Sequence, residues 1–237
     1  MKKYIPNSIT LLNLFFGCCA LVSIFNQQYF STFVFLALGG LADYADGMIA
    51  RLLKVHSTLG KELDSMADMV SFGVAPGAIL YVLLSLSFPT AEAAICYPAL
   101  PAFLVSMFAG LRLARFNLDT RQTEDFIGLN TPSSTMFVVG LMLIYANDSL
   151  GLAEWVIQPV FLYIVIAVLS FLLVAELPMF GFKFKGLHWK GNEIRWSFIV
   201  LSLILVVFLK EAAFALIIFL YILLALINFW FFAKNDQ

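Results

Sequence analysis

Long apolar stretches dominate this sequence and restrict the folds open to it. Hydrophobic residues make up 62% of the 237 residues and charged residues only 12%, and the mean hydropathy is +0.95. A helix needs roughly 20 apolar residues to cross a bilayer, and it satisfies its own backbone hydrogen bonds where water is absent. The composition therefore predicts an all-α integral membrane protein without a separate soluble domain.

The apolar stretches predict about eight transmembrane helices within a single membrane domain over residues 1–237. The expected spans cover residues 5–25, 30–53, 64–86, 94–116, 132–146, 155–175, 196–209 and 212–232. The sequence motifs discussed below all lie within residues 5–185, so the last two spans are expected to be additional helices.

The positions of Lys and Arg orient these spans. If the N-terminus is cytoplasmic, every basic residue except Lys210 falls on the cytoplasmic side. Cytoplasmic loops carry an excess of Lys and Arg, so both termini are expected in the cytoplasm. No transit peptide is recognised before the first expected span, so the plasma (inner) membrane is expected for a prokaryotic source.

Four aspartates interrupt this apolar chain. Asp43 and Asp46 are three residues apart, and Asp64 and Asp68 are four apart, so each pair shares one helix face. The polar run 54–62 between the pairs predicts a helical hairpin in which the two faces meet near the turn. Four facing carboxylates repel strongly at low dielectric unless cations lie between them. Oxygen ligands alone favour Mg²⁺ or Mn²⁺.

The residues beside the first pair favour a pyrophosphate ligand. Gly47 and Arg51 follow Asp43 at four-residue steps on the same helix face. Together with Ala50, Gly47 leaves room for a bulky ligand near the backbone, and the Arg51 guanidinium matches phosphate oxygens. The alternative is that the acids are only solvated at the membrane edge. Acids within a membrane span are costly, however, and are usually functional.

The pattern D-x-x-D-G-x-x-A-R, eight residues, then G-x-x-x-D-x-x-x-D resembles the signature of the CDP-alcohol phosphotransferase family. The resemblance implies a membrane enzyme in which the hydroxyl of a second alcohol displaces CMP from a CDP-linked lipid or alcohol. It implies two divalent ions, one held by Asp43, Asp46 and Asp64. Asp43, Asp64 and Asp68 would hold the second, with Asp68 as the base for the attacking hydroxyl. It also implies nucleotide contacts from Gly47, Ala50, Arg51 and Gly60.

Two further segments are candidates for nucleotide binding. Residues 6–13 read P-N-x-x-T-x-x-N and resemble the opening of the same family, which implies that Asn7 and Thr10 help to enclose the nucleotide. The alternative is that Asn7 caps the first helix, and the two roles are compatible. Ser57 and Thr58, in the expected hairpin turn, are candidate donors to phosphate or cytosine.

Three motifs resemble the phosphatidylserine synthase branch of the family: SFGVAP at 71–76, RLARFN at 112–117 and FIGLNTP at 126–132. Asn130 stands where a proline is common in that branch. The resemblance implies CDP-diacylglycerol as donor, L-serine as acceptor, and phosphatidylserine and CMP as products. Arg112 and Arg115 are candidates for binding the serine carboxylate, although anchoring at a cytoplasmic helix end is the alternative.

Other functions remain open at this stage. A sibling enzyme would use glycerol 3-phosphate or inositol as the acceptor. A multispan ion-coupled carrier would show unwound mid-membrane helices and repeated halves, and the sequence shows neither. The expected partners are membrane lipids and, by family resemblance, a second copy of the chain in a homodimer. No nucleic-acid partner is expected.

Overall fold

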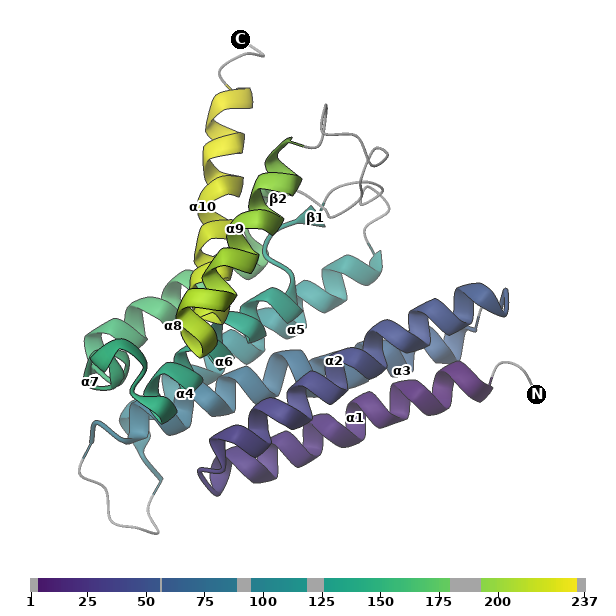
Figure 1. Cartoon of the computed structure of the whole chain (residues 1–237). Helices are drawn as coiled ribbons and strands as arrows, with labels where there is room; N and C mark the ends of the chain where they lie inside the picture. Colours follow the sequence, from purple (N-terminus) through teal and green to yellow (C-terminus); the bar gives the residue numbers. More distant parts are fainter. Residues whose placement is uncertain (1–3, 56, 89–94, 119–125, 180–192, 234–237) are drawn as a thin grey trace.

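The computed structural model describes residues 4–55, 57–88, 95–118, 126–179 and 193–233, and this part of the chain is almost wholly helical (Figure 1). The helices are α1 (Tyr4–Phe25), α2 (Tyr29–Leu52), α3 (Thr58–Asp68), α4 (Ala75–Ser85), α5 (Leu104–Leu118), α6 (Thr131–Asn147), α7 (Ala153–Val156), α8 (Pro159–Val174), α9 (Glu193–Leu209) and α10 (Ala213–Ala233). The short elements are the π-helix η1 (Met69–Val74), the 3₁₀ helices η2 (Tyr97–Phe103), η3 (Ser149–Gly151) and η4 (Lys210–Ala212), and the strands β1 (Phe126–Ile127) and β2 (Pro178–Met179).

The predicted class, an all-α integral membrane protein, is confirmed. Among the described residues, five helical stretches are long and apolar enough to cross a membrane: Tyr4–Phe25, Tyr29–Leu52, Thr58–Ser85, Tyr97–Leu118 and Trp196–Ile227. The apolar helix α8 is shorter. The predicted count of eight spans remains a prediction, because the described residues give five candidate spans and place α9 and α10 within one of them.

The orientation of the chain also remains a prediction. Several of the basic residues on which it rests lie outside the described residues, namely Lys2, Lys3, Arg121, Lys183, Lys185, Lys190 and Lys234.

Two helix boundaries differ from the expected spans for local reasons. The third expected span begins at residue 64, but α3 begins at Thr58, because the Ser57 hydroxyl accepts a hydrogen bond from the Gly60 amide and caps the helix. The sixth expected span, 155–175, is broken between α7 and α8, where Pro159 starts a new helix.

The stretch formed by α3, η1 and α4 is the centre of the bundle. In its most apolar window 72% of the residues are buried, compared with 22% in α2 and 28% in α1. The other helices surround it and leave much of their apolar surface exposed, as expected for faces that contact lipid.

The π-helix η1 follows Asp68 and is stabilised by neighbouring helices. Pro76 has no amide hydrogen, so the carbonyl of Phe72 loses its partner within the helix. The Thr135 hydroxyl of α6 donates to that carbonyl at 3.1 Å. The Ser106 hydroxyl of α5 donates to the carbonyl of Gly73 at 2.8 Å. The expected irregularity at 71–77 is therefore present, and it links the central helix to α5 and α6.

A two-residue antiparallel pairing fixes the start of α6. Strand β1 pairs with β2, and the Leu129 amide donates to the Leu172 carbonyl of α8 at 2.9 Å. Asn130 then caps α6, because its Oδ1 accepts from the Ser133 amide at 2.7 Å. Asparagine is a favoured N-cap residue, which accounts for Asn130 at this position.

Helix α10 packs closely on α6. A Cβ atom on Gly140 of α6 would overlap the backbone of Ala215 in α10. Small residues allow membrane helices to approach in this way. The ring of Phe33 in α2 also contacts Phe214 of α10, with centroids 5.6 Å apart. The C-terminal helices are therefore part of the same packed unit.

Candidate active site

The turn between α2 and α3 returns the chain through two helix caps. The Val55 amide donates to the Ala50 carbonyl at 3.0 Å, and Lys54 has a φ of 53°. A left-handed residue in this place is typical of a Schellman motif, which ends a helix and reverses the chain. Ser57 then caps α3 through its hydrogen bond with Gly60. The turn thus sets the two aspartate-bearing helices next to each other.

This hairpin brings three of the four predicted metal ligands together. Asp43 from α2 and Asp64 and Asp68 from α3 each offer a carboxylate oxygen, and these oxygens lie within 4.8 Å of one another. All three side chains are half-buried. Negative charges this close repel at low dielectric, whereas oxygen ligands are those that a hard divalent cation prefers. Within the described residues, this aspartate cluster therefore fits a divalent cation.

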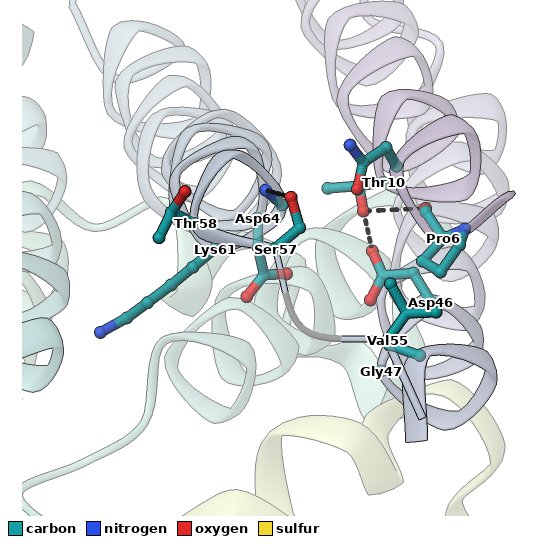
Figure 2. A pocket seen from close by; sticks show the side chains of 12 residues that line it. Pro6, Thr10, Asp46, Gly47, Val55, Ser57, Thr58, Lys61 and Asp64 are labelled. Atoms are coloured by element: carbon teal, nitrogen blue, oxygen red, sulfur yellow. Dashed lines mark hydrogen bonds between the residues drawn. The ribbon is translucent and has the colours of Figure 1, made fainter. Parts of the chain in front are cut away.

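Asp46 lies beside the aspartate cluster and has a different partner. Its side chain is 6% exposed, and its Oδ2 accepts from the Thr10 hydroxyl at 2.5 Å. The same hydroxyl lies 3.1 Å from the Pro6 carbonyl, and Figure 2 shows both contacts. The predicted ion shared by Asp43, Asp46 and Asp64 remains a prediction, because the cluster found among the described residues does not include Asp46.

Asn13 of α1 is a hydrogen-bond partner of Asp68. It is completely buried, and its Nδ2 donates to Asp68 Oδ1 at 3.4 Å. The Ser71 hydroxyl of η1 donates to the Asn13 Oδ1 at 2.7 Å, so the amide nitrogen must face Asp68. No role for Asn13 followed from the sequence. The sequence feature that could have indicated this role is the position of Asn13, a polar residue three positions after Thr10 within an apolar helix.

A cavity of about 480 Å³, the larger cavity, lies between α1, α2 and α3. Its lining includes seven of the eight predicted nucleotide residues: Asn7, Thr10, Gly47, Ala50, Ser57, Thr58 and Gly60. Asp46 and Asp64 face it from opposite sides (Figure 2). A Cβ atom on Gly47 would meet no described atom within 4 Å, so the glycine leaves open space. The volume suits a small-molecule ligand.

Two basic residues near the larger cavity differ in placement. Arg51, the eighth predicted nucleotide residue, is exposed and is not among the described residues that line the cavity. Lys61 does line it, but its Nζ donates to the Asn117 carbonyl at 3.0 Å. Figure 2 shows its amine pointing away from Asp46 and Asp64. Lys61 therefore ties α3 to the end of α5.

A smaller cavity of about 200 Å³ also borders the aspartate cluster. It is lined by residues of α3, α5 and the start of α6, namely Asp64, Ser65, Asp68, Arg112, Leu113, Phe116, Asn117, Asn130, Thr131 and Pro132. The Asn117 Nδ2 donates to the Ser65 hydroxyl at 2.7 Å, which holds α5 against α3. Asp64 lines both cavities. The two cavities therefore meet at the cluster.

Arg112 is the cation that faces the smaller cavity. Its side chain is 7% exposed, and its Nε has no hydrogen-bond partner among the described residues. It lies 6.0 Å from the ring centre of Phe116 and interacts electrostatically with Asp68. A buried donor without a partner is unfavourable, and a guanidinium binds carboxylates and phosphates well. By contrast, Arg115 is exposed and is not among the described residues lining the cavity.

The geometry defines a membrane-embedded site with two ligand cavities joined at a cluster of carboxylates. A model of the CDP-alcohol phosphatidyltransferase family matches residues 3–175, which carry every residue of this site. The chain therefore belongs to the CDP-alcohol phosphatidyltransferase family.

Several relatives within this family share one enzyme name. The chain is 34% identical over 183 residues to the CDP-diacylglycerol–serine O-phosphatidyltransferase of Bacillus subtilis, with 76% of this chain and 92% of that protein covered. It is 27% identical to the protein of the same name from Helicobacter pylori, with 85% and 78% covered. The Mycobacterium leprae protein of that name is 31% identical, but the chain spans only 58% of its length.

Proposed function

We propose that this chain transfers the phosphatidyl group of CDP-diacylglycerol to the hydroxyl of L-serine, giving phosphatidylserine and CMP. The observation that carries this proposal is the aspartate cluster at the junction of two cavities, with the unpaired Arg112 donor in the smaller one. The names of the relatives supply the two substrates. In this proposal the nucleotide lies in the larger cavity and serine in the smaller one.

The larger cavity supplies contacts for CDP. Asn7, Thr58 and Ser57 offer amide and hydroxyl groups for the phosphates and the cytosine, while Gly47 and Ala50 let the nucleoside approach α2. Arg51 is exposed near this cavity, so its proposed contact with phosphate requires its flexible side chain to turn towards the ligand.

The aspartate cluster is the proposed site for Mg²⁺ or Mn²⁺, with two ions as the family resemblance implies. Asp43, Asp64 and Asp68 would hold the metal, and Asp46 would extend the site towards the nucleotide. When bound, divalent cations neutralise pyrophosphate charge and stabilise the charge that develops on the departing phosphate. Without them the clustered carboxylates would repel the pyrophosphate.

The transfer is proposed to be a direct displacement at phosphorus. The serine hydroxyl oxygen bonds to the phosphorus that carries diacylglycerol, and the bond from that phosphorus to the CMP oxygen breaks, so CMP leaves with the electron pair. Asp68 takes the hydroxyl proton, since it lines the smaller cavity and is oriented by Asn13. Arg112 binds the serine carboxylate. A carboxylate is a weak base for an alcohol, so Asp68 acts through its position as charge develops.

The proposal places the site at the cytoplasmic face of the plasma membrane. Arg51, Lys54 and Lys61 lie at the hairpin turn beside the cluster, and such residues concentrate on the cytoplasmic side. Bacterial relatives support the plasma membrane as the compartment. A homodimer is proposed on family resemblance.

The test is an acceptor comparison with the full chain purified in detergent. With CDP-diacylglycerol and Mg²⁺ or Mn²⁺, serine should release CMP and yield phosphatidylserine, detected by mass spectrometry, and a chelator should stop the reaction. Release with glycerol 3-phosphate or inositol instead of serine would assign a sibling activity. Failure of all three acceptors, with folded protein and added metal, would overturn the proposal.

A further inference from the structure

A third cavity, the apolar cavity, lies between α6, α9 and α10 and has a volume of about 340 Å³. Its walls are almost wholly apolar: Met136 comes from α6, Phe198 and Val206 from α9, and Ile217 and Tyr221 from α10. The volume lies within the range of small-ligand pockets. The family match ends at residue 175, so two of the three walls come from helices that the family model does not cover.

The apolar cavity adjoins the smaller cavity of the active site. Thr131 and Pro132 line the smaller cavity, and Ser133, the next residue of α6, lines the apolar cavity. From α10, Tyr221 lines the apolar cavity and interacts electrostatically with Arg112 of the smaller cavity. Two separate chain segments therefore place the two cavities next to each other.

The apolar cavity extends away from the active site along α9. The rings of Phe198 and Tyr221 pack with centroids 5.9 Å apart, and Tyr221 marks the end nearest Arg112. Both Phe198 and Val206 line the cavity, and the helix advances about 12 Å between them. An apolar cavity that starts beside a polar site and follows a membrane helix suits a hydrocarbon chain joined to a polar headgroup.

Ser202 adds a polar atom to the wall of the apolar cavity. Its Oγ is buried and has no hydrogen-bond partner among the described residues. Buried hydroxyl groups usually have a partner, and an acceptor on a ligand in this cavity would supply one to Ser202. The carbonyl oxygen of an acyl ester is an acceptor that accompanies a hydrocarbon chain.

We propose that the apolar cavity binds one acyl chain of the CDP-linked lipid donor, with an ester carbonyl at Ser202. This inference rests on the proposed function, which supplies a donor with acyl chains. The donor's headgroup then lies at the aspartate cluster, while one of its chains lies along α9 and α10. The C-terminal helices thus contribute to donor binding without contacting the reacting atoms.

The first test measures binding and does not depend on turnover. The full chain in phosphatidylcholine nanodiscs is irradiated with a CDP-diacylglycerol that carries a diazirine in one acyl chain, and labelled peptides are identified by mass spectrometry. Labels are expected on α9 and α10 at the apolar cavity, and excess unlabelled CDP-diacylglycerol should remove them. Equal labelling by a phosphatidylcholine diazirine probe, or labelling that donor does not compete, would overturn the proposal.

Two adjacent valines give a matched kinetic test. Val206 lines the apolar cavity, whereas Val207 is 73% exposed and is not among its described lining residues. Val206→Trp should raise the KM for a long-chain donor about tenfold, with little change for a dihexanoyl donor, while Val207→Trp should change neither. Equal effects of the two variants would overturn the proposal. If the wild-type chain shows competed labelling but no serine-dependent CMP release, the proposed function fails and the acyl-chain site stands.

Discussion

The two cavities that meet at the aspartate cluster are built in different ways. The larger cavity is lined by residues between Pro6 and Asp64, all from consecutive helices and the turn that joins two of them. The smaller cavity combines residues 64–68, 112–117 and 130–132. The first therefore depends on local structure, whereas the second depends on how α5 and α6 pack against the central stretch formed by α3, η1 and α4.

Because of this difference, the proposed donor and acceptor are bound by side chains from different helices. We expect substitutions of the side chains that hold the donor to leave α5 and α6 in place, and substitution of Arg112 to leave α1 and α2 in place. Variants on the two sides should therefore alter different Michaelis constants. Asp68 lies where the sides meet, so its loss should affect the reaction itself.

The largest effect is expected for Asp68→Asn. Removing the proposed base should lower kcat by about 100- to 10,000-fold, with the KM for both substrates changed much less. Steady-state CMP release with serine measures the effect, and thermal unfolding of the purified variant checks that it folds. Full activity would remove Asp68 from the mechanism.

The next largest effect is expected on the acceptor side. Arg112→Gln should raise the KM for serine by about 10- to 100-fold, because a charge-assisted hydrogen bond is lost, and should leave the KM for CDP-diacylglycerol nearly unchanged. Arg115→Gln is the contrasting variant, since Arg115 is exposed, and a smaller effect is expected. A larger rise in the serine KM for Arg115→Gln would reverse the assignment.

A smaller rise in KM is expected on the donor side. Thr10→Val keeps the shape of the side chain but removes the hydroxyl that donates to Asp46, so the KM for CDP-diacylglycerol should rise about tenfold. The serine KM should stay near the wild-type value. Ser8→Ala on the exposed face of α1 provides the control. If Thr10→Val changed only the serine KM, the two-sided description would be wrong.

The smallest effect is expected for the residues that position Asp68. Asn13→Ala should lower kcat about 3- to 10-fold, because one long hydrogen bond to the base, of 3.4 Å, is lost, with both Michaelis constants little changed. Ser71→Ala should give a weaker loss of the same kind, since it only frees the Asn13 amide to turn. An unchanged kcat in a folded Asn13→Ala variant would limit Asn13 to packing.

Much of the larger cavity could be predicted from the sequence because its information is local. The spacing within Asp43/Asp46 and within Asp64/Asp68 predicted that each pair shares a helix face, and the short polar turn between the pairs predicted that the two faces meet. Even here the sequence did not predict that Asp46 lies outside the cluster of Asp43, Asp64 and Asp68. Its partner Thr10 is 36 residues away and belongs to another helix.

Most of the smaller cavity could not be predicted in the same way. Arg112 and Arg115 are both basic residues at one helix end, and only the packing of α5 within the bundle buries the first and exposes the second. The contact between Asn13 and Asp68, 55 residues apart, likewise depends on how α1 crosses the central helix.

The sequence by itself determined the helical membrane class and the residues of the aspartate hairpin, because apolar length and helical spacing are properties of short segments. Only the tertiary structure decided which polar side chains face the cavities and that α6, α9 and α10 line a third one beside them. Those features depend on contacts between helices that are distant in the chain, and each helix has several polar or apolar faces that could have been turned inward.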